Sequence, residues 1–253
     1  MKMIKTIVYF SYVVAVVIAV LPIGIVALIL SFLGLARPMR VMIYRVAQGW
    51  AKLCVKFTGC TVTVTGRENI PRSGSVCFVS NHVGIFDIVL LLAYCGRPIG
   101  FIAKKELLFI PLFNIWIVLL GGLFIDRGNI RKAFRTIDKG IARVKAGGGM
   151  IIFPEGHRSR ERGLLPFHPG SLKLATQAEA PIVPVAIAGS YEVFEKTYRV
   201  TAAPVRVSFL KPVTTADLPS TDRKIVLCEK IYSIIKEELE AGGSVFTPTP
   251  PAL

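Results

Sequence analysis

The N-terminal part of the chain is a hydrophobic run with no charged residue from Thr6 to Ala36. A straight helix over this run would be ~46 Å long, against about 30 Å for the hydrocarbon core of a bilayer. Leu21-Pro22-Ile23-Gly24 interrupts the run near its middle. The pattern therefore predicts a membrane anchor, either one tilted helix kinked at Pro22 or two short helices forming a hairpin in one leaflet.

Positive charges flank both ends of this run: Lys2 and Lys5 precede it, and Arg37, Arg40 and Arg45 follow it. Because lysine and arginine are enriched on the cytoplasmic side of membrane segments, both ends are predicted to be cytoplasmic, which favours the hairpin. A cleaved signal peptide does not fit, since the run is too long and no small-residue cleavage site ends it.

Basic residues recur among apolar ones from Arg37 to Phe57, a stretch that includes Trp50. This pattern is typical of a helix that lies on lipid headgroups. It is equally typical of an amphipathic helix packed on the body of the protein, and both interpretations remain open at this point.

Beyond residue 60 the hydrophobic pattern changes to short strands that alternate with helices. Strands are predicted at Cys60–Thr65, Ser75–Ser80, Ile99–Ala103, Leu123–Ile125, Met150–Phe153, Ile182–Ala188 and Val205–Leu210. Helices are predicted at Asp87–Tyr94, Pro111–Leu120, Ile130–Lys145, Ser171–Ala178 and Thr221–Glu240. This alternation predicts an α/β fold with a mixed, largely parallel sheet flanked by helices.

Three regions follow from these patterns: a membrane anchor with an interfacial helix over 1–58, an α/β domain over 59–241, and a flexible tail over 242–253. The stretch from Leu107 to Ile125 is also uncharged, and could be a second membrane span. Pro111, Asn114 and Gly121-Gly122 interrupt it, so we interpret it as a buried helix followed by a strand.

The charge balance of the chain is strongly positive. Its 253 residues include 31 Lys and Arg against 16 Asp and Glu, a net charge of +15, yet 53% of the residues are hydrophobic. The hydrophobicity excludes a disordered basic tail, and the single long apolar run argues against a multi-pass transporter. The combination indicates a globular domain that meets an anionic membrane or a phosphate-bearing substrate. No nucleic-acid-binding motif is present, so nucleic acid is not a predicted partner.

The five cysteines are scattered and form no C-x-x-C motif. This spacing favours reduced, mostly buried thiols in a body that faces the cytosol, and it predicts no metal site. The chain also lacks the G-x-S-x-G, P-loop and G-x-G-x-x-G motifs. A serine hydrolase, a P-loop NTPase and a dinucleotide oxidoreductase are therefore disfavoured.

The pair His82 and Asp87 spans the junction between a predicted strand and the next helix. With His82 in the loop and Asp87 in the first helical turn, a carboxylate oxygen can hold the histidine Nδ1–H and leave Nε2 to accept a proton. This is a base and its orienting group, with a substrate hydroxyl as the nucleophile. A structural histidine beside a helix-capping aspartate is the alternative.

Two further strands are followed directly by charged residues. Arg127 comes after Leu123–Ile125, and Glu155 and Arg158 come after Met150–Phe153. Because the carboxyl ends of strands in an α/β sheet gather at one edge, these loops are predicted to meet the His82 loop. Two arginines in one cleft suit a phosphate, which accepts paired hydrogen bonds.

Four sequence blocks in this region resemble those of the glycerolipid acyltransferase family. They are Asn81-His82-Val83-Gly84-Ile85-Phe86-Asp87 (N-H-x-x-x-x-D), Gly121 to Arg127 (G-x-x-F-[IV]-D-R), Phe153 to Ser159 (F-P-E-G-T-R-S) and Ile182-Val183-Pro184-Val185-Ala186 (V-P-V). Within the family, the chain is most similar to the bacterial members that acylate 1-acyl-sn-glycerol 3-phosphate. The resemblance covers roughly residues 60 to 210, and one position departs from it, because His157 stands where the family has threonine.

The resemblance implies transfer of an acyl group from a thioester to the sn-2 hydroxyl of 1-acyl-sn-glycerol 3-phosphate (lysophosphatidic acid), which yields phosphatidic acid for phospholipid synthesis. By its motifs, His82 is the general base and Asp87 orients it. The residues implied to bind the glycerol phosphate end are Arg127, Glu155, Gly156 and Arg158, with Lys105 as a further phosphate or oxyanion contact.

The same resemblance implies acyl-CoA or acyl carrier protein as co-substrate, with no cofactor and no metal. It places the enzyme at the inner membrane with its catalytic domain facing the cytoplasm, and makes the bilayer a partner. The stretch Leu107–Leu120 becomes a candidate wall for an acyl-chain channel, against plain core packing. Two other activities stay open, sn-1 acylation of glycerol 3-phosphate and acylation of another lysophospholipid, as does a non-catalytic basic protein that binds membrane lipid.

Overall fold

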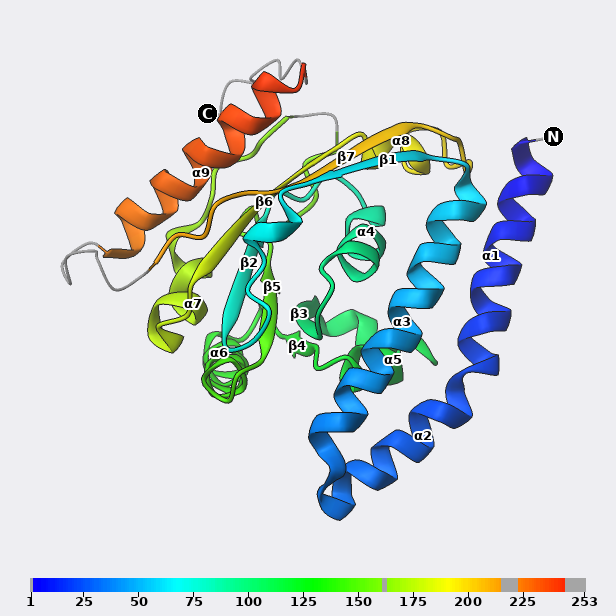
Figure 1. The fold of residues 1–253 in the computed structure, drawn as a ribbon, viewed down its shortest axis with the longest axis horizontal. Helices are drawn as coiled ribbons and strands as arrows, with labels where there is room; N and C mark the ends of the chain where they lie inside the picture. Colours follow the sequence, from blue (N-terminus) through cyan, green and yellow to red (C-terminus); the bar gives the residue numbers. More distant parts are fainter. Residues whose placement is uncertain (1, 161–162, 215–222, 244–253) are drawn as a thin grey trace.

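The computed structural model describes residues 2–160, 163–214 and 223–243. A single seven-stranded sheet with the order β1-β7-β6-β2-β5-β3-β4 forms its centre (Figure 1). All neighbouring strands are parallel except β6 and β7, which are antiparallel. The strands are β1 (Thr61–Thr65), β2 (Val76–Ser80), β3 (Ile99–Lys104), β4 (Leu123–Ile125), β5 (Gly149–Ile152), β6 (Ile182–Ala188) and β7 (Pro204–Phe209). The mixed, largely parallel sheet predicted from the sequence is therefore confirmed.

The helices of the domain cover both faces of the sheet. They are α3 (Ala36–Thr58), α4 (Phe86–Tyr94), α5 (Phe113–Leu119), α6 (Ile130–Lys145), α7 (Lys173–Ala178), α8 (Ser190–Val193) and α9 (Arg223–Ala241). Figure 1 shows α6, α7 and α9 on one face and α3 and α4 on the other. The predicted elements are all present, with ends shifted by at most two residues. The predicted start at Thr221 and the tail beyond residue 243 lie outside the described residues.

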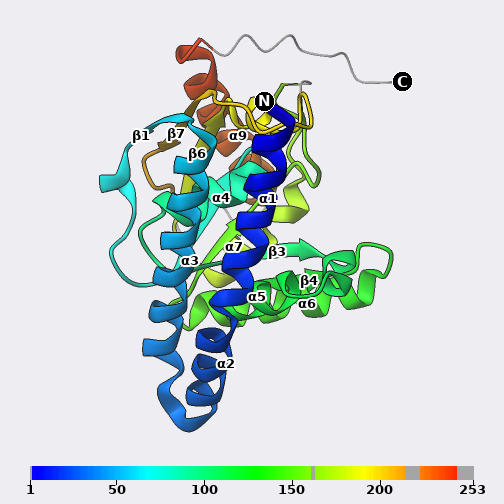
Figure 2. The same ribbon diagram turned by 90° about the vertical axis from the view of Figure 1, so that its right-hand side faces the viewer.

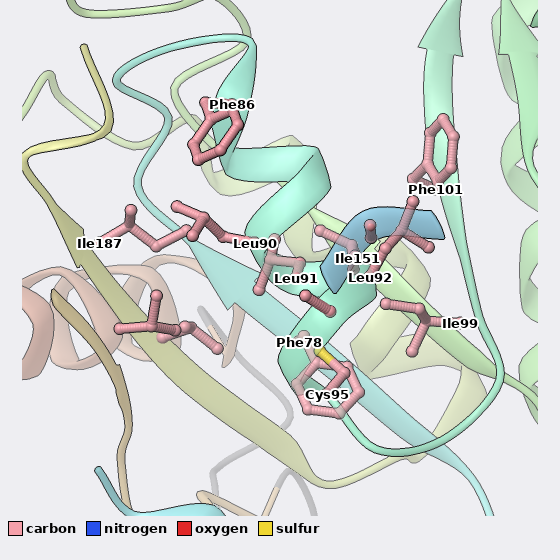
Figure 3. Packing of buried hydrophobic residues seen from close by; sticks show 14 of the residues in the cluster. Phe78, Phe86, Leu90, Leu91, Leu92, Cys95, Ile99, Phe101, Ile151 and Ile187 are labelled. Atoms are coloured by element: carbon pink, nitrogen blue, oxygen red, sulfur yellow. The ribbon is translucent and has the colours of Figure 1, made fainter. Parts of the chain in front are cut away.

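The hydrophobic core has two halves because the central strands are buried on both faces. Every residue of β2 is buried, as expected for a strand whose Val, Cys and Phe side chains alternate between two covered faces. Phe78 packs with Leu90, Leu91 and Ile99 on the α4 side (Figure 3). Cys77 and its neighbours pack with α7 and α9 on the other side.

The N-terminal segment consists of α1 (Lys2–Ala19) and α2 (Leu21–Leu30), which meet at a kink next to Pro22. Within the described residues, this is the one helical stretch long and apolar enough to cross a membrane. The chain reverses only afterwards, at Ser31–Leu35, where Gly34 has a φ of +89°. Figure 2 shows α3 running back alongside α1 and α2.

This geometry corrects the predicted hairpin. The segment Thr6–Ala36 does not fold back on itself at Leu21–Gly24, because proline is tolerated in the first turn of α2 and only bends the path. The segment is therefore one helical stretch with a kink, as the other alternative described. A hairpin is still present, but its two arms are α1–α2 and α3, with the reversal at Ser31–Leu35.

Helix α3 packs on the α/β body. Its inner face, which includes Tyr44, Ala51 and Cys54, is buried, and it lies against α4. Its basic residues Arg45, Lys52 and Lys56 are exposed on the other face. The packed amphipathic helix is thus the interpretation that the structure supports, with a basic outer face that is free to meet anionic lipid.

Candidate active site

His82 and Asp87 lie together at the carboxyl end of β2. His82 stands in the loop after the strand, Asp87 in the first turn of α4, and Nδ1 of the ring lies 2.8 Å from Oδ2 of the carboxylate. The His82 side chain is 17% exposed and that of Asp87 is fully buried. The ring stacks on Phe153, with 4.1 Å between ring centroids. With Nδ1 held in this way, Nε2 is the nitrogen that can accept a proton.

Asp87 also organises the loop that carries His82. Its Oδ2 accepts hydrogen bonds from the backbone N–H groups of Val83 (2.7 Å) and Gly84 (3.0 Å), and its Oδ1 accepts one from the Ser190 hydroxyl. The carboxylate therefore orients the histidine and holds the loop before α4, whereas the first turn of α4 has no side-chain cap.

Glu155 lies behind His82, fully buried in the loop after β5. One carboxylate oxygen accepts the His82 backbone N–H at 2.6 Å, and the other accepts the Leu165 N–H at 3.2 Å. Burial raises the pKa of this carboxyl to about 8, although the two hydrogen bonds act in the opposite direction. Its contacts are with the loop backbone, so the substrate-binding role predicted for Glu155 stays a prediction, while the structure shows it supporting His82.

This raised pKa predicts a pH dependence of stability. The folded protein holds the Glu155 proton more tightly than the unfolded chain, so unfolding becomes easier as the pH rises from about 4.5, the ordinary value, to about 8. We expect Glu155→Gln to lose this dependence of stability on pH, because glutamine has no carboxyl group to titrate. Thermal unfolding in detergent at a series of pH values checks it: the difference between variant and wild type should grow up to about pH 8 and then level off, and a difference independent of pH would contradict it.

The predicted phosphate-binding cations cluster around neighbouring loops, and each has a partner. Lys105 Nζ lies 2.9 Å from the carboxylate of Asp126. Their hydrogen bond raises the pKa of Lys105 and lowers that of Asp126, so both groups are charged at neutral pH. The Arg127 guanidinium donates to the carbonyl oxygen of Gly156 and so ties the loop after β4 to the loop after β5.

Arg158 forms an ion pair with Glu195, a residue that the motif analysis did not single out. Arg158 keeps about two fifths of its side chain exposed, while Glu195 is buried. His157, next to it, is exposed and takes no part in the His82 network. The motif blocks include Asn81 but assign it no role; its side chain donates to the Ile187 carbonyl, accepts the Ile187 N–H and so fixes the loop to β6.

An apolar cavity of about 430 Å³ opens beside the His82 loop. Ile85, from the loop itself, and Phe86, the first residue of α4, belong to its wall. The remaining lining residues come from the N-terminal helices, α3, α4, Phe101 of β3, the segment 107–120 and the residues after β6. Among the described residues, no group of three or more His, Cys, Asp or Glu side chains could hold a metal ion. The site thus combines a histidine that can accept a proton, cationic side chains on neighbouring loops and an apolar cavity.

Comparison with known proteins agrees with this arrangement. The sequence model of the acyltransferase family matches residues 61–188, which contain His82, Asp87, Arg127, Glu155 and Arg158. The chain therefore belongs to the acyltransferase family. The resemblance that the four sequence blocks indicated is confirmed.

Particular relatives carry the name 1-acyl-sn-glycerol-3-phosphate acyltransferase. A protein of Salmonella typhimurium is 34% identical over 68% of this chain and 74% of its own length. A protein of Cocos nucifera is 36% identical over 63% of this chain and 52% of its own. A crystal structure of the 1-acyl-sn-glycerophosphate acyltransferase PlsC from Thermotoga maritima superposes with a TM-score of 0.79 at 28% identity and covers 96% of this chain and 98% of that one. The chain spans only 52% to 60% of the length of the relatives from Cocos, Limnanthes douglasii and Borreliella burgdorferi.

Proposed function

We propose that this protein transfers an acyl group from acyl-CoA or acyl carrier protein to the sn-2 hydroxyl of 1-acyl-sn-glycerol 3-phosphate, forming phosphatidic acid. The observation that carries the proposal is the 2.8 Å contact between His82 and Asp87, which flank Ile85 and Phe86 in the wall of an apolar cavity. The names of the relatives in Salmonella and Thermotoga support the same substrate.

The chemistry needs no covalent intermediate on the protein. Nε2 of His82 takes the proton from the sn-2 hydroxyl while the oxygen attacks the thioester carbonyl. The carbon–sulfur bond then breaks, and the imidazolium returns the proton to the departing thiolate. Asp87 stabilises the positive charge that His82 carries in between, because its buried carboxylate faces Nδ1. A new ester and a free thiol are the products.

The cations beside this base are suited to the acceptor's phosphate. Lys105, Arg127 and Arg158 come from three different loops near the strand ends, as the resemblance implies for phosphate binding. The partners that they have within the chain, Asp126, the Gly156 carbonyl and Glu195, hold them in place before substrate arrives. Fixed cations bind an anion with less loss of side-chain entropy than mobile ones.

The apolar cavity is the proposed site for an acyl chain. Leu107, Phe113, Trp116, Ile117 and Leu120 all line it, which matches the wall predicted at Leu107–Leu120. A chain of CH2 groups gains about 0.8 kcal/mol for each one that it buries, so the depth of the cavity would set the preferred chain length.

We expect Leu120→Trp to shorten the preferred acyl chain without abolishing turnover, because the larger ring occupies cavity volume and leaves His82 in place. Val118→Trp is the matched control: Val118 lies two residues earlier, in α5, is 52% exposed and does not line the cavity. Competition between acyl donors of different lengths measures the preference. An unchanged preference in Leu120→Trp, or the same change in both variants, would place the acyl chain elsewhere.

The proposed location is the inner membrane, with the catalytic domain facing the cytoplasm. Apolar side chains such as Ile4, Ile7, Ile18 and Ile29 are exposed along α1 and α2, where lipid would cover them. Because α3 returns alongside them, both ends of the hairpin meet the same side of the membrane, and the basic outer face of α3 suits anionic headgroups.

An assay of thiol release tests the proposed function. The full chain in detergent or vesicles receives either donor type, with lysophosphatidic acid, glycerol 3-phosphate or a lysophospholipid with a full headgroup as acceptor. Release that depends on lysophosphatidic acid is the expected result. A preference for glycerol 3-phosphate or another lysophospholipid would show that the proposed acceptor is wrong. Absence of release with every acceptor would favour the alternative of a non-catalytic protein that binds lipid.

A further inference from the structure

The segment after β6 brings two buried polar side chains to the catalytic loop, although it lies beyond residue 188, where the match to the family ends. Ser190 and Glu195 are both buried, and both contact residues of the block Asn81 to Asp87. The tight turn that delivers them depends on Gly189, whose φ is +82° and where a Cβ would lie 2.2 Å from the Pro204 carbonyl oxygen.

Glu195 makes two contacts at once, one with each of its oxygens. Oε1 pairs with the Arg158 guanidinium, in the loop after β5. Oε2 accepts the backbone N–H of Ile85 at 2.7 Å, in the loop after β2. The same oxygen would lie 2.3 Å from a Cβ at Gly84, so the loop backbone is packed directly on the carboxylate.

These contacts join two loops that perform different tasks in the proposed reaction. Ile85 is three residues beyond the base and lines the apolar cavity, while Arg158 is a predicted ligand of the acceptor phosphate. A buried carboxylate between them is costly to leave without partners, and the Glu195 side chain is only 9% exposed. Glu195 therefore orients the Arg158 guanidinium, and the same side chain holds the His82 loop in place through the Ile85 amide.

We propose that Glu195 is a positioning residue of this acyltransferase: it aims Arg158 at the acceptor phosphate and holds the Ile85 amide, and with it the His82 loop. The inference rests on the proposed function. Ser190 completes the arrangement from the same segment by donating to Asp87. The residues after β6, which lie outside the motif blocks, thus support the active site through Ser190 and Glu195.

Two substitutions separate the two contacts. Glu195→Gln keeps an oxygen that can accept the Ile85 N–H but loses the charge that pairs with Arg158. We expect the KM for lysophosphatidic acid to rise about tenfold, the usual effect of losing one hydrogen bond to a charged group, with kcat and the KM for acyl-CoA changed less than about twofold. Glu195→Ala loses both contacts, so we expect kcat to fall about tenfold as well.

Glu192→Gln is the matched control, because Glu192 precedes Glu195 by three residues and its pair with Lys196 is exposed, with 45% of the Glu192 side chain accessible. It should leave every constant unchanged. In an Arg158→Ala background, Glu195→Gln should alter the KM for the acceptor by less than about twofold, since the residue through which it acts is gone. All variants are compared as the full chain, with thermal unfolding as a check on folding; if Glu195→Ala does not fold, Glu195→Gln carries the test.

The inference is overturned if Glu195→Gln behaves like Glu192→Gln, if its effect falls on acyl-CoA alone, or if its effect adds fully to that of Arg158→Ala. Failure of the proposed function is a separate outcome. In that case the wild-type protein itself releases no thiol in response to lysophosphatidic acid, whatever the variants do.

Discussion

Replacement of His82 by alanine should lower kcat about 10²- to 10⁴-fold, the usual contribution of a general base, while the protein still folds. The imidazole is the base in the proposed step, and Asp87 holds it through Nδ1 at 2.8 Å. The side chain is 17% exposed and its main packing partner is Phe153, so its loss should affect stability much less than turnover. Thiol release with saturating substrates measures the fall in kcat.

His157 provides the control for this experiment. It is exposed, and His157→Thr introduces the residue that the motif resemblance implies for this position. We expect near-normal turnover from His157→Thr. A His82→Ala protein that retains near-wild-type transfer would refute the assignment of the base.

Asp87→Asn should also produce a large loss, up to about 10⁴-fold in kcat, by analogy with the loss of tautomer control in serine protease triads. The carboxylate accepts from four donors: the His82 ring, two loop amides and the Ser190 hydroxyl. A carboxamide has only one acceptor oxygen, so it cannot satisfy all four, and it no longer stabilises the imidazolium. Thiol release with saturating substrates measures the fall in kcat, and thermal unfolding separates it from any loss of stability.

Asp138→Asn is the matched control for charge removal, since Asp138 is exposed on α6. Equal effects of the two substitutions on kcat would show that Asp87 only holds the loop before α4 and takes no part in the reaction.

Most of the fold was predictable because its signals are local. Buried parallel strands are continuous apolar runs, and β2 carries this pattern from Val76 to Val79. The pairing of His82 with Asp87 was predictable as well, since a strand-end loop followed by a helix start brings residues five apart together. The parallel topology then gathers Arg127, Glu155 and Arg158 at the same edge of the sheet.

The direction of individual side chains was not predictable. Glu155 and Arg158 stand in one short loop, yet Glu155 turns inward to the His82 amide and Arg158 turns toward Glu195. The sequence gives the position of a residue after a strand, whereas its direction depends on the turn geometry of the whole loop. Ser190 and Glu195 escaped notice because they lie 103 residues from Asp87 and 110 residues from Ile85, their partners near the His82 loop.

The place where the N-terminal segment turns back was also not predictable from the sequence. Hydrophobicity is nearly uniform from Thr6 to Ala36, so the pattern does not tell a kink from a turn. Pro22 attracts attention but is tolerated at a helix start, while the reversal occurs at Ser31–Leu35. Likewise, a basic amphipathic helix has the same pattern whether its apolar face meets lipid or α4, and only the packing of α3 decided between them.

Analysis of the product tests the central claim most directly. The full chain is given an acyl donor labelled in its acyl chain together with 1-acyl-sn-glycerol 3-phosphate, and the phosphatidic acid formed is cleaved by a lipase specific for the sn-2 position. We predict that the label is recovered in the released fatty acid, and that His82→Ala yields almost no labelled product. Label that stays on the lysolipid, or the absence of labelled phosphatidic acid with either acyl-CoA or acyl carrier protein as donor, would contradict the proposed reaction.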